Sequence, residues 1–458
     1  MLTDPLAAAD RALCGEIWTA QTAWETLVHL CEDYGSRFAG TPEEAGTAEF
    51  LAARLRDDGL AHVRVEPFTF NGWQRGPAHV QVLAPDPCAL PCLALPYCPH
   101  GAVEGEIVNL GNGTPGEFEA AGDLGGKIAL IGARSPAYVG RGVHRGEKYG
   151  RAVAAGAAGV LWMRAEGGLL PETGSLRFNA PGEVLGLGIS NEDGAALLRQ
   201  AEKGPVRVRL TSESTNLRLT SQNVAGTIPG RRGDRHILVG AHYDTHDIAP
   251  GAVDDGTGVV VALEVARALG AQRAALDAPV RVVFFGAEEM GLVGAHAYVE
   301  EHRADLDRVL FMLNLDAIGQ DISNKGLALQ GWASLIPYFR DLARLMGESL
   351  TVDNDVIMYS DHFPFMLAGV PSGYLCRMEA GSGTRGYGHT AADTLDKVKL
   401  RDLRLAALLS ARLVLYASNH PDLPARRKTE AETIALFHTL GYDEVMRIEQ
   451  TWPFQATE

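Results

Sequence analysis

The chain has 458 residues, more than one ordinary hydrophobic core organises, so its length favours two or three domains. Its formal net charge is -16, from 57 acidic and 41 basic residues. This argues against nucleic acid as a partner, because phosphate binding needs clustered Lys and Arg. Apolar runs such as Val280 to Phe285 are strand-sized, far below the ~20 residues that cross a bilayer, so we expect no membrane anchor.

The opening residues and the cysteines indicate the compartment. The first residues carry acids early and lack a basic start, an apolar run and a small-residue cleavage site, so we read no signal peptide. Six scattered cysteines are too sparse for a disulfide scaffold, and we expect reduced thiols in a cytoplasm. Cys88, Cys92, Cys98 and His100 offer four zinc ligands, but their spacing is not that of a structural zinc knuckle. We therefore favour reduced cysteines without a structural zinc ion here.

The sequence pattern of the first half of the chain changes from helical to β-rich. Apolar residues at helical spacing predict helices over Ala23 to Leu30 and, after a Gly-Thr-Pro breaker, over Thr47 to Leu55. Alternation then predicts a strand from His62 to Phe68. From about Gly76 to Thr211, short β-rich runs divided by Gly and Pro surround one small helix at Lys148 to Gly156. This stretch is typical of an inserted module.

From Asn223 onward, strands alternate with helices, and a charged tail with two helical stretches follows Pro421. Such alternation predicts an α/β fold with a mixed, mostly parallel sheet flanked by helices. The expected strands cover residues 236–241, 280–285 and 309–315, and the expected helices cover 256–269, 292–301 and 400–416.

Three of the predicted core strands run straight into residues that can bind metal. His242, Glu289 and Asp316 each follow a buried strand, and sites in open α/β sheets lie at the carboxyl ends of strands. Asp244, two positions after His242, is expected to accept a hydrogen bond from the imidazole and fix its tautomer. We therefore expect these side chains to meet at one rim of the sheet.

Two loops complete the predicted metal site. Asp254 lies in a turn whose glycines let the backbone approach a ligand, and it can bridge two cations. His389, in the Gly-rich loop Gly386 to Thr390, is the natural fifth ligand. Each residue alone is more typical of a cap or a loop position, but together two histidines and three carboxylates favour a pair of divalent ions such as zinc.

Glu288 has a separate predicted role. Two such ions, about 3.5 to 4 Å apart, activate water for attack on a carbonyl, and Glu288 is expected to face that water as general base. The alternative is a carboxylate at a helix start near Met290. The sequence lacks a Walker loop, a zincin helix and a lipase elbow, and we interpret Gly256 to Val259 as helix packing because the third glycine of a dinucleotide fingerprint is missing.

The blocks GAHYDTH, GAVDDGTG, FFGAEEMGLVGA, NLDAIG and YGHTAADTLDKV resemble, in order, those of the di-zinc exopeptidases of peptidase clan MH. The resemblance implies one ion held by His242 and Asp316, a second held by Glu289 and His389, and Asp254 between them. It also places Glu288 on the general base.

Further details follow from the same resemblance. It implies a cis peptide between Asp254 and Asp255. The block Tyr359 to Phe365 resembles one that lines the substrate cleft, which makes Tyr359 and His362 candidates for stabilising the oxyanion, with packing at a strand end as an equal alternative.

Residues Asp123 to Ile131 and Lys148 to Met163 resemble a protease-associated domain. We therefore divide the chain into four parts, since the tail matches nothing in the family. They are 1–75, the N-terminal part of the peptidase domain; 76–215, the inserted protease-associated domain; 216–420, the di-metal catalytic domain; and 421–458, a C-terminal helical extension.

The favoured function is an aminopeptidase with peptide substrates, and a homo-oligomer stays open. A carboxypeptidase would need cations for a terminal carboxylate, for which Arg377 and Arg385 are candidates. Glutaminyl cyclases share this fold with a single zinc, and transferrin receptors resemble it after losing metal ligands. Retention of every ligand and of Glu288 argues against both.

Overall fold

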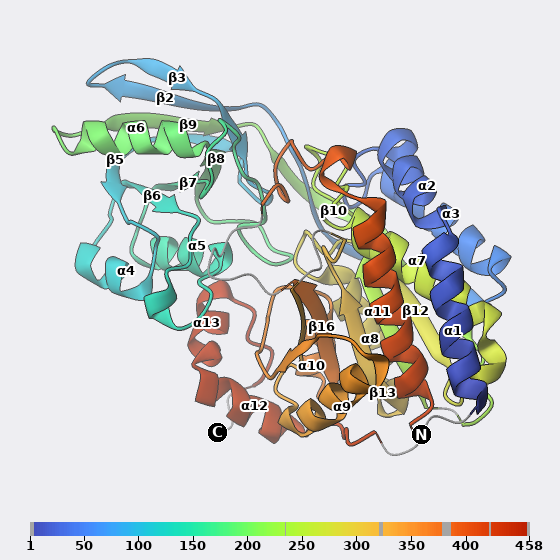
Figure 1. The fold of residues 1–458 in the computed structure, drawn as a ribbon. Helices are drawn as coiled ribbons and strands as arrows, with labels where there is room; N and C mark the ends of the chain where they lie inside the picture. Colours follow the sequence, from blue (N-terminus) through green and yellow to red (C-terminus); the bar gives the residue numbers. More distant parts are fainter. Residues whose placement is uncertain (1–3, 234, 320–323, 378–385, 421–422, 456–458) are drawn as a thin grey trace.

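Two eight-stranded sheets organise the described part of the chain (Figure 1). The computed structural model describes all residues except 1–3, 234, 320–323, 378–385, 421–422 and 456–458. In the first sheet the four central strands run parallel, and antiparallel strands flank them. In sheet order its strands are β1 (Ala61–Gln74), β10 (Thr215–Ile228), β12 (Val280–Phe285), β11 (His236–His242), β13 (Val309–Leu315), β16 (Ser372–Arg377), β14 (Lys325–Ala328) and β15 (Thr351–Asp353).

Helices cover both faces of this sheet because its central strands are apolar on both sides. Along β11, Val239 packs into one core cluster, whereas its neighbour Leu238 packs into another with Phe285 on the opposite face. The continuous apolar run of a doubly covered strand explains why β11 could be predicted. The first face carries α1 (Asp4–Thr19), α2 (Thr22–His29), a π-helical turn (Leu30–Tyr34), α3 (Pro42–Asp57), α7 (Gly256–Ala271), α9 (Ile336–Met346) and α11 (Leu400–Ser418); the second carries α8 (Val293–Glu301) and α10 (His362–Leu367). The expected α/β fold is confirmed.

The second sheet is built between the two longest strands of the first. β1 and β10 pair antiparallel from Ala61 opposite Thr227 to Gln74 opposite Thr215, and the chain leaves and returns at that end. We keep the four-part division as a proposal on this basis. The strands of the second sheet, in sheet order, are β3 (Cys88–Leu90), β2 (Ala78–Ala84), β9 (Arg207–Ser212), β5 (Gly101–Asn109), β6 (Ile128–Gly132), β7 (Gly159–Met163), β8 (Leu185–Ile189) and β4 (Cys92–Ala94). The helices of this part are α4 (Pro115–Ala121), α5 (Arg145–Ala154) and α6 (Asn191–Ala201).

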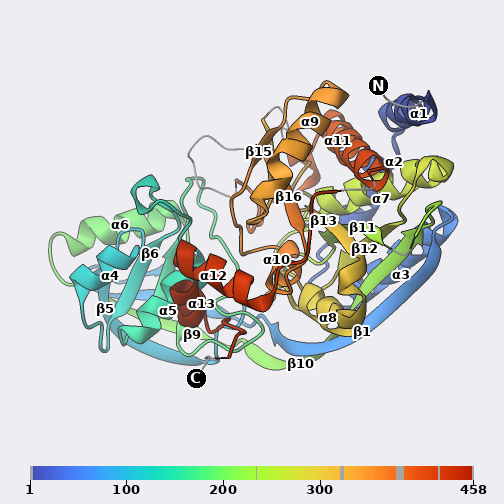
Figure 2. The same ribbon diagram turned by 90° about the horizontal axis from the view of Figure 1, so that it is seen from below.

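The C-terminal tail joins the two halves. Its helices α12 (Glu430–Leu440) and α13 (Tyr442–Glu449) lie between α5 and α10 (Figure 2). Phe437 of α12 packs edge-on against Phe363 of α10, and Arg151 of α5 donates to Glu444 of α13. The tail therefore ties the second sheet to the first.

The largest difference between a predicted and an observed helix boundary lies at the start of α3. The helix expected from Thr47 begins at Pro42, because the Thr41 side chain accepts the N–H of Glu44 and caps it. The Gly-Thr-Pro segment is therefore a helix start as well as the end of the preceding loop. Among the described helices, none is both long and apolar enough to cross a membrane.

Replacing Gly258 with alanine is predicted to destabilise the fold. A Cβ at Gly258 in α7 would lie 2.3 Å from the carbonyl oxygen of Leu315. We expect the free energy of unfolding to fall by about 1 to 3 kcal/mol in urea titrations. Gly15→Ala in α1 is the matched control, since nothing lies within 4 Å of its added Cβ and it should stabilise slightly. Equal stability of the two variants would contradict the packing argument.

Candidate metal centre

The carboxyl ends of three adjacent parallel strands deliver the centre of the site. β11 ends at His242, and the chain reaches Glu289 and Asp316 just after the neighbouring strands β12 and β13. His242 Nε2 lies 3.2 Å from Asp254 Oδ1 and 3.9 Å from Asp316 Oδ1. The structure therefore brings these side chains from separate elements into one buried cluster.

Asp254 lies between two histidines. Its Oδ1 faces His242 Nε2, and its Oδ2 lies 3.3 Å from His389 Nε2. The peptide between Asp254 and Asp255 is cis. Asp255 also lies near His242, but its Oδ1 accepts the N–H groups of Gly258 and Ala317, which makes it the cap of α7. Of the two aspartates, Asp254 has the geometry of a bridge.

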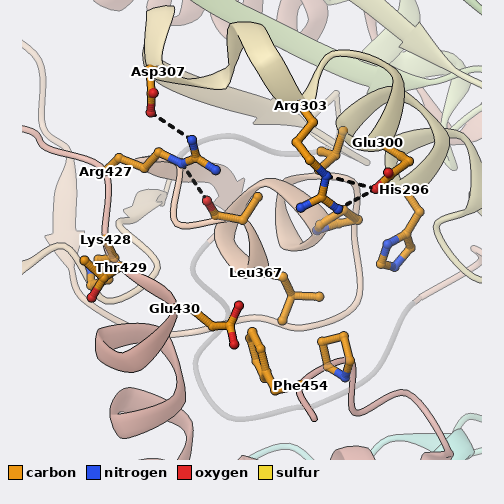
Figure 3. A pocket seen from close by; sticks show the side chains of 14 residues that line it. His296, Glu300, Arg303, Asp307, Leu367, Arg427, Lys428, Thr429, Glu430 and Phe454 are labelled. Carbon is orange, nitrogen blue, oxygen red and sulfur yellow. Dashed lines mark hydrogen bonds and ion pairs between the residues drawn. The ribbon is translucent and has the colours of Figure 1, made fainter.

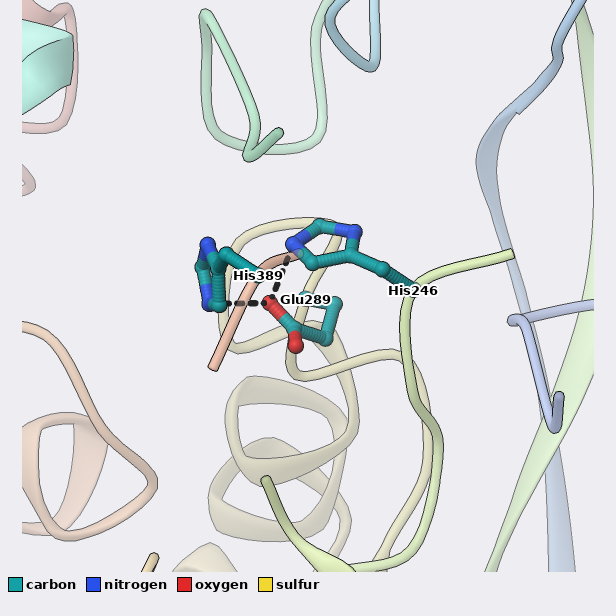
Figure 4. Close-up of side chains that lie close together, drawn as sticks. All are labelled: His246, Glu289 and His389. Carbon is teal, nitrogen blue, oxygen red and sulfur yellow. Dashed lines mark ion pairs between the residues drawn. The ribbon is translucent and has the colours of Figure 1, made fainter. Parts of the chain in front are cut away.

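A second cluster, which we call the Glu289 site, consists of Glu289, His389 and His246 (Figure 4). Glu289 Oε2 lies 3.2 Å from His389 Nε2 and 2.9 Å from His246 Nε2. His246 was not among the sequence candidates, because a histidine two residues after Asp244 in a loop carries no periodic signal. Its proximity to Glu289 depends on the fold of that loop.

Asp244 makes contacts beyond the one with His242 that the sequence predicted. Its carboxylate accepts the main-chain N–H of Glu288 at 2.9 Å and of Glu289 at 3.2 Å. His242 Nδ1 instead lies 3.1 Å from the main-chain carbonyl of Asp244 and 3.6 Å from its carboxylate. The turn after β12 thus presents two N–H groups to this carboxylate, at shorter distances than the imidazole. Asp244 therefore fixes the loop that carries Glu288 and Glu289, and its carbonyl orients His242.

The two neighbouring glutamates have opposite electrostatics. Burial, Glu289 and Asp361 raise the pKa of Glu288 well above its usual value, although His242 opposes this. Burial also acts to raise the pKa of Glu289, but the imidazoles of His246 and His389 outweigh it and hold that pKa well below the usual range. Adjacent carboxyl groups with separated pKa values are typical of a ligand beside a proton acceptor.

Negative charge exceeds positive charge in this cluster, which fits divalent cations. Beside the ligand candidates, Asp361 is fully buried, and neither of its carboxylate oxygens has a hydrogen-bond partner in the described part of the chain. Burial and the nearby acids Asp244 and Asp316 raise its pKa well above the usual value. Buried uncompensated carboxylates are costly, and nitrogen and carboxylate donors at these spacings suit zinc.

Residues near the ligands hold them in place. Asp393 accepts the N–H of Val253 at 2.7 Å and of Asp254 at 3.1 Å. Ser360 donates to Asp316 Oδ2 at 2.6 Å. Both lie inside motif blocks that the sequence analysis quoted, four residues after His389 and one after Tyr359, so block membership was the available signal.

The inserted part of the chain contributes directly to the site. Thr173 donates its N–H to the carbonyl of His389 at 2.9 Å, and its own carbonyl lies 3.2 Å from His389 Nδ1. Ser175 donates its hydroxyl to the carbonyl of Glu289. A loop after β7 thus orients two ligand candidates, which no local sequence signal indicates.

A narrow cleft of about 40 Å³ opens onto the cluster. Tyr359 lines it, with its ring stacked 3.8 Å from that of His144, but its hydroxyl donates to Glu449 at 3.1 Å. His362 is buried behind the cleft, where Nε2 lies 2.8 Å from the Ile357 carbonyl. Burial lowers the pKa of His362 to about 4. Of the two oxyanion candidates, only Tyr359 reaches the cleft.

Other sequence candidates do not join the cluster. Neither group of potential metal ligands found among the described residues contains Cys88, Cys92, Cys98 or His100. Arg385 lies outside the described residues, as does the side chain of Arg377, the last residue of β16.

A wider pocket of about 560 Å³ lies elsewhere, between α8, α10 and the C-terminal tail (Figure 3). Both of its arginines are paired with acids, Arg427 with Asp307 and Arg303 with Glu300. It includes none of the metal-ligand candidates, so we place the active site in the narrow cleft.

Comparisons with known proteins agree with this architecture. Residues 223–414 match the model of peptidase family M28, and residues 103–197 match the PA domain. The chain is 29% identical over 425 residues to Aminopeptidase YwaD of Bacillus subtilis, covering 91% of this chain and 89% of that protein. Its fold matches a peptidase M28 precursor from Shewanella amazonensis with a TM-score of 0.77 and 25% identity, covering 93% and 98% of the two chains. It also matches BSAP, a zinc aminopeptidase from Bacillus subtilis, with a TM-score of 0.66 and 28% identity, covering 87% and 94%.

Residues 223–414 therefore form a peptidase domain of family M28, and residues 103–197 form an inserted PA domain. The resemblance stated from the sequence is confirmed at the level of the family and of the inserted domain.

Ser360→Ala is predicted to weaken metal binding. Ser360 donates to Asp316 and accepts a hydrogen bond from Asn314, so its loss frees the carboxylate to rotate. We expect affinity for zinc to fall about 10-fold in competition with a chromogenic chelator. Ser372→Ala is the matched control, because this buried hydroxyl donates to the carbonyl of Val370 away from the cluster. Equal zinc affinity in both variants would contradict the assigned role.

Proposed function

We propose that this chain is a zinc-dependent aminopeptidase that removes N-terminal residues from peptides, with two ions in the cluster. The observation that carries the proposal is Asp254, whose two carboxylate oxygens face His242 and His389 separately. One ion would be held by His242, Asp254 and Asp316, and the other by Asp254, Glu289 and His389. When bound, the pair supplies polarisation of the scissile carbonyl and a lowered pKa for the attacking water.

Glu288 is the proposed general base. It lines the cleft, and its main-chain N–H is held by Asp244. Its carboxylate is therefore placed to take the proton from the attacking water and return it to the leaving amine. Its raised pKa in the bare protein reflects burial among acids, and nearby cations would lower it toward the working range.

The shape and charge of the cleft favour a free amine at the peptide end. The cleft is narrow, and the inserted domain closes one side through His144 and Phe178. The carboxylates around it attract a protonated amine and repel a terminal carboxylate. Arg145 is a cation in the lining that could attract a terminal carboxylate. Its guanidinium instead donates to the carbonyls of Ser175 and Thr173. These features favour the aminopeptidase over the carboxypeptidase alternative, and the matched relatives named as aminopeptidases support the same choice.

We retain the cytoplasm as the proposed location, on the composition of the chain and its free cysteines.

The proposed function predicts selectivity for free N-termini. Aminoacyl p-nitroanilides and dipeptides should be cleaved, whereas their N-acetylated forms should react at least about 100-fold more slowly, since the blocked amine loses its charge. Metal content is measured on the same preparation, and chelator-treated protein should be inactive until zinc is restored. Cleavage of blocked peptides as fast as free peptides would contradict the aminopeptidase assignment.

Glu288→Gln is predicted to lower kcat by about 10²- to 10⁴-fold with little change in zinc content, because the amide cannot take a proton. Steady-state kinetics and elemental analysis provide the readouts. Glu300→Gln, an exposed glutamate of α8, controls for the loss of one carboxylate. A Glu288→Gln enzyme with near-normal kcat would remove this residue from the mechanism.

A further inference from the structure

We infer that His246 is an additional ligand of the ion in the Glu289 site. That site would then be closed by four protein side chains, His246, Asp254, Glu289 and His389, while the site of His242 and Asp316 keeps an open position. This inference rests on the proposed function and adds a difference between the two ions.

The donor atoms of the Glu289 site lie close enough together to share one ion. Bonds of about 2.0 to 2.2 Å place neighbouring ligand atoms roughly 3.2 to 3.6 Å apart. His389 Nε2 lies 3.2 Å from Glu289 Oε2 and 3.3 Å from Asp254 Oδ2. His246 Nε2 lies 2.9 Å from the same Glu289 oxygen, and all three donors of the cluster lie within 4.8 Å of one another. His246 thus offers one more donor atom beside the carboxylate and the imidazole that already face each other in this site.

The orientation of the ring supports this role. His246 is 4% exposed, and neither ring nitrogen has a hydrogen-bond partner of suitable geometry among the described residues. Nε2 nevertheless points toward the carboxylate of Glu289, and the ring stands at 82° to that of His389 with centroids 4.3 Å apart (Figure 4). A buried imidazole close to a carboxylate oxygen but out of line with it fits two ligands that share an ion between them.

The surrounding contacts fix His246 in this position. The next residue, Asp247, receives two hydrogen bonds from Arg75, at 2.7 and 2.6 Å. The preceding residue, Thr245, donates its N–H to the carbonyl of Arg37 at 3.2 Å. Both neighbours of His246 are therefore hydrogen-bonded to parts of the chain far away in sequence. Its ring is thus already in place to bind an ion.

Four protein ligands at one ion and three at the other give the sites different properties. Fully ligated zinc sites are structural in character, whereas catalytic sites keep a position for water or substrate. We therefore expect one tightly held ion in the Glu289 site and one exchangeable ion beside His242.

The first experiment measures zinc affinity. Protein stripped of metal is titrated with Zn²⁺ against a chromogenic chelator, and the unchanged protein should bind in two steps that differ at least about tenfold. His246→Ala should weaken the tight step by about 100-fold. His362→Ala is the matched control, since it also removes a buried imidazole but lies outside the cluster. Affinities within threefold of the unchanged protein in His246→Ala would overturn the inference.

The second experiment separates a ligand from a hydrogen-bonding neighbour. Long-range ¹⁵N–¹H spectra of histidine-labelled protein, read through the ring carbon protons, are recorded before and after Zn²⁺ is added. The signal that disappears in His246→Ala belongs to His246. Its Nε2 should move to the range of a zinc-bound imidazole nitrogen, together with those of His242 and His389. A weakened tight step with no such movement would mean that His246 only orients Glu289, and the inference would be wrong.

These readouts are independent of peptide cleavage. If the unchanged protein binds no zinc or cleaves only blocked peptides, the proposed function fails. If it binds two zinc ions and is active while His246→Ala binds zinc equally well, the proposed function stands and the role of His246 falls.

Discussion

Electrostatic repulsion among buried acids is the constraint on which the rest of the structure depends. Asp254, Glu288, Glu289, Asp316 and Asp361 lie around three histidines in a place where little water can screen their charges. Without cations, such a cluster is stable only if some carboxyl groups keep their protons, which the raised pKa values of Glu288 and Asp361 reflect. Divalent ions remove this cost, so metal binding and the stability of the site are one equilibrium.

The scaffold holds these acids with main-chain donors, which cannot swing away. Asp244 holds the loop of Glu288 and Glu289, and Asp393 holds the loop of Asp254, each through two N–H groups. Burial raises the pKa of Asp393 to about 7, so its two N–H contacts only partly offset the cost of its charge. The ligands are thus oriented before any ion arrives, which lowers the entropy that binding has to overcome.

The sequence predicted the part of the site that follows from strand order. His242, Glu289 and Asp316 end buried strands, and parallel neighbours in one sheet must end at the same rim, so their meeting could be expected from periodicity. The prediction of Asp254 and His389 as ligands depended on the motif blocks as well. His246, Thr173 and Glu449 could not be predicted, because each reaches the site through packing between distant segments. The contacts of Asp244 with Glu288 and Glu289 could not be predicted for a related reason, because those N–H donors belong to another loop.

The inserted domain changes what the cleft can do, because it is bonded to the ligands themselves. Thr173 is hydrogen-bonded to the ring and main chain of His389, and Ser175 to the main-chain carbonyl of Glu289. The wall of the cleft that the inserted domain forms therefore orients the His389 ring and holds the main chain of Glu289. The tail reinforces the same wall, since Glu449 accepts from Tyr359 and lies 3.6 Å from His144 of the inserted domain. Moving this wall outward to admit the middle of a peptide would disturb the ligands that cleavage requires. Restriction to a chain end is therefore a consequence of how the metal site is assembled.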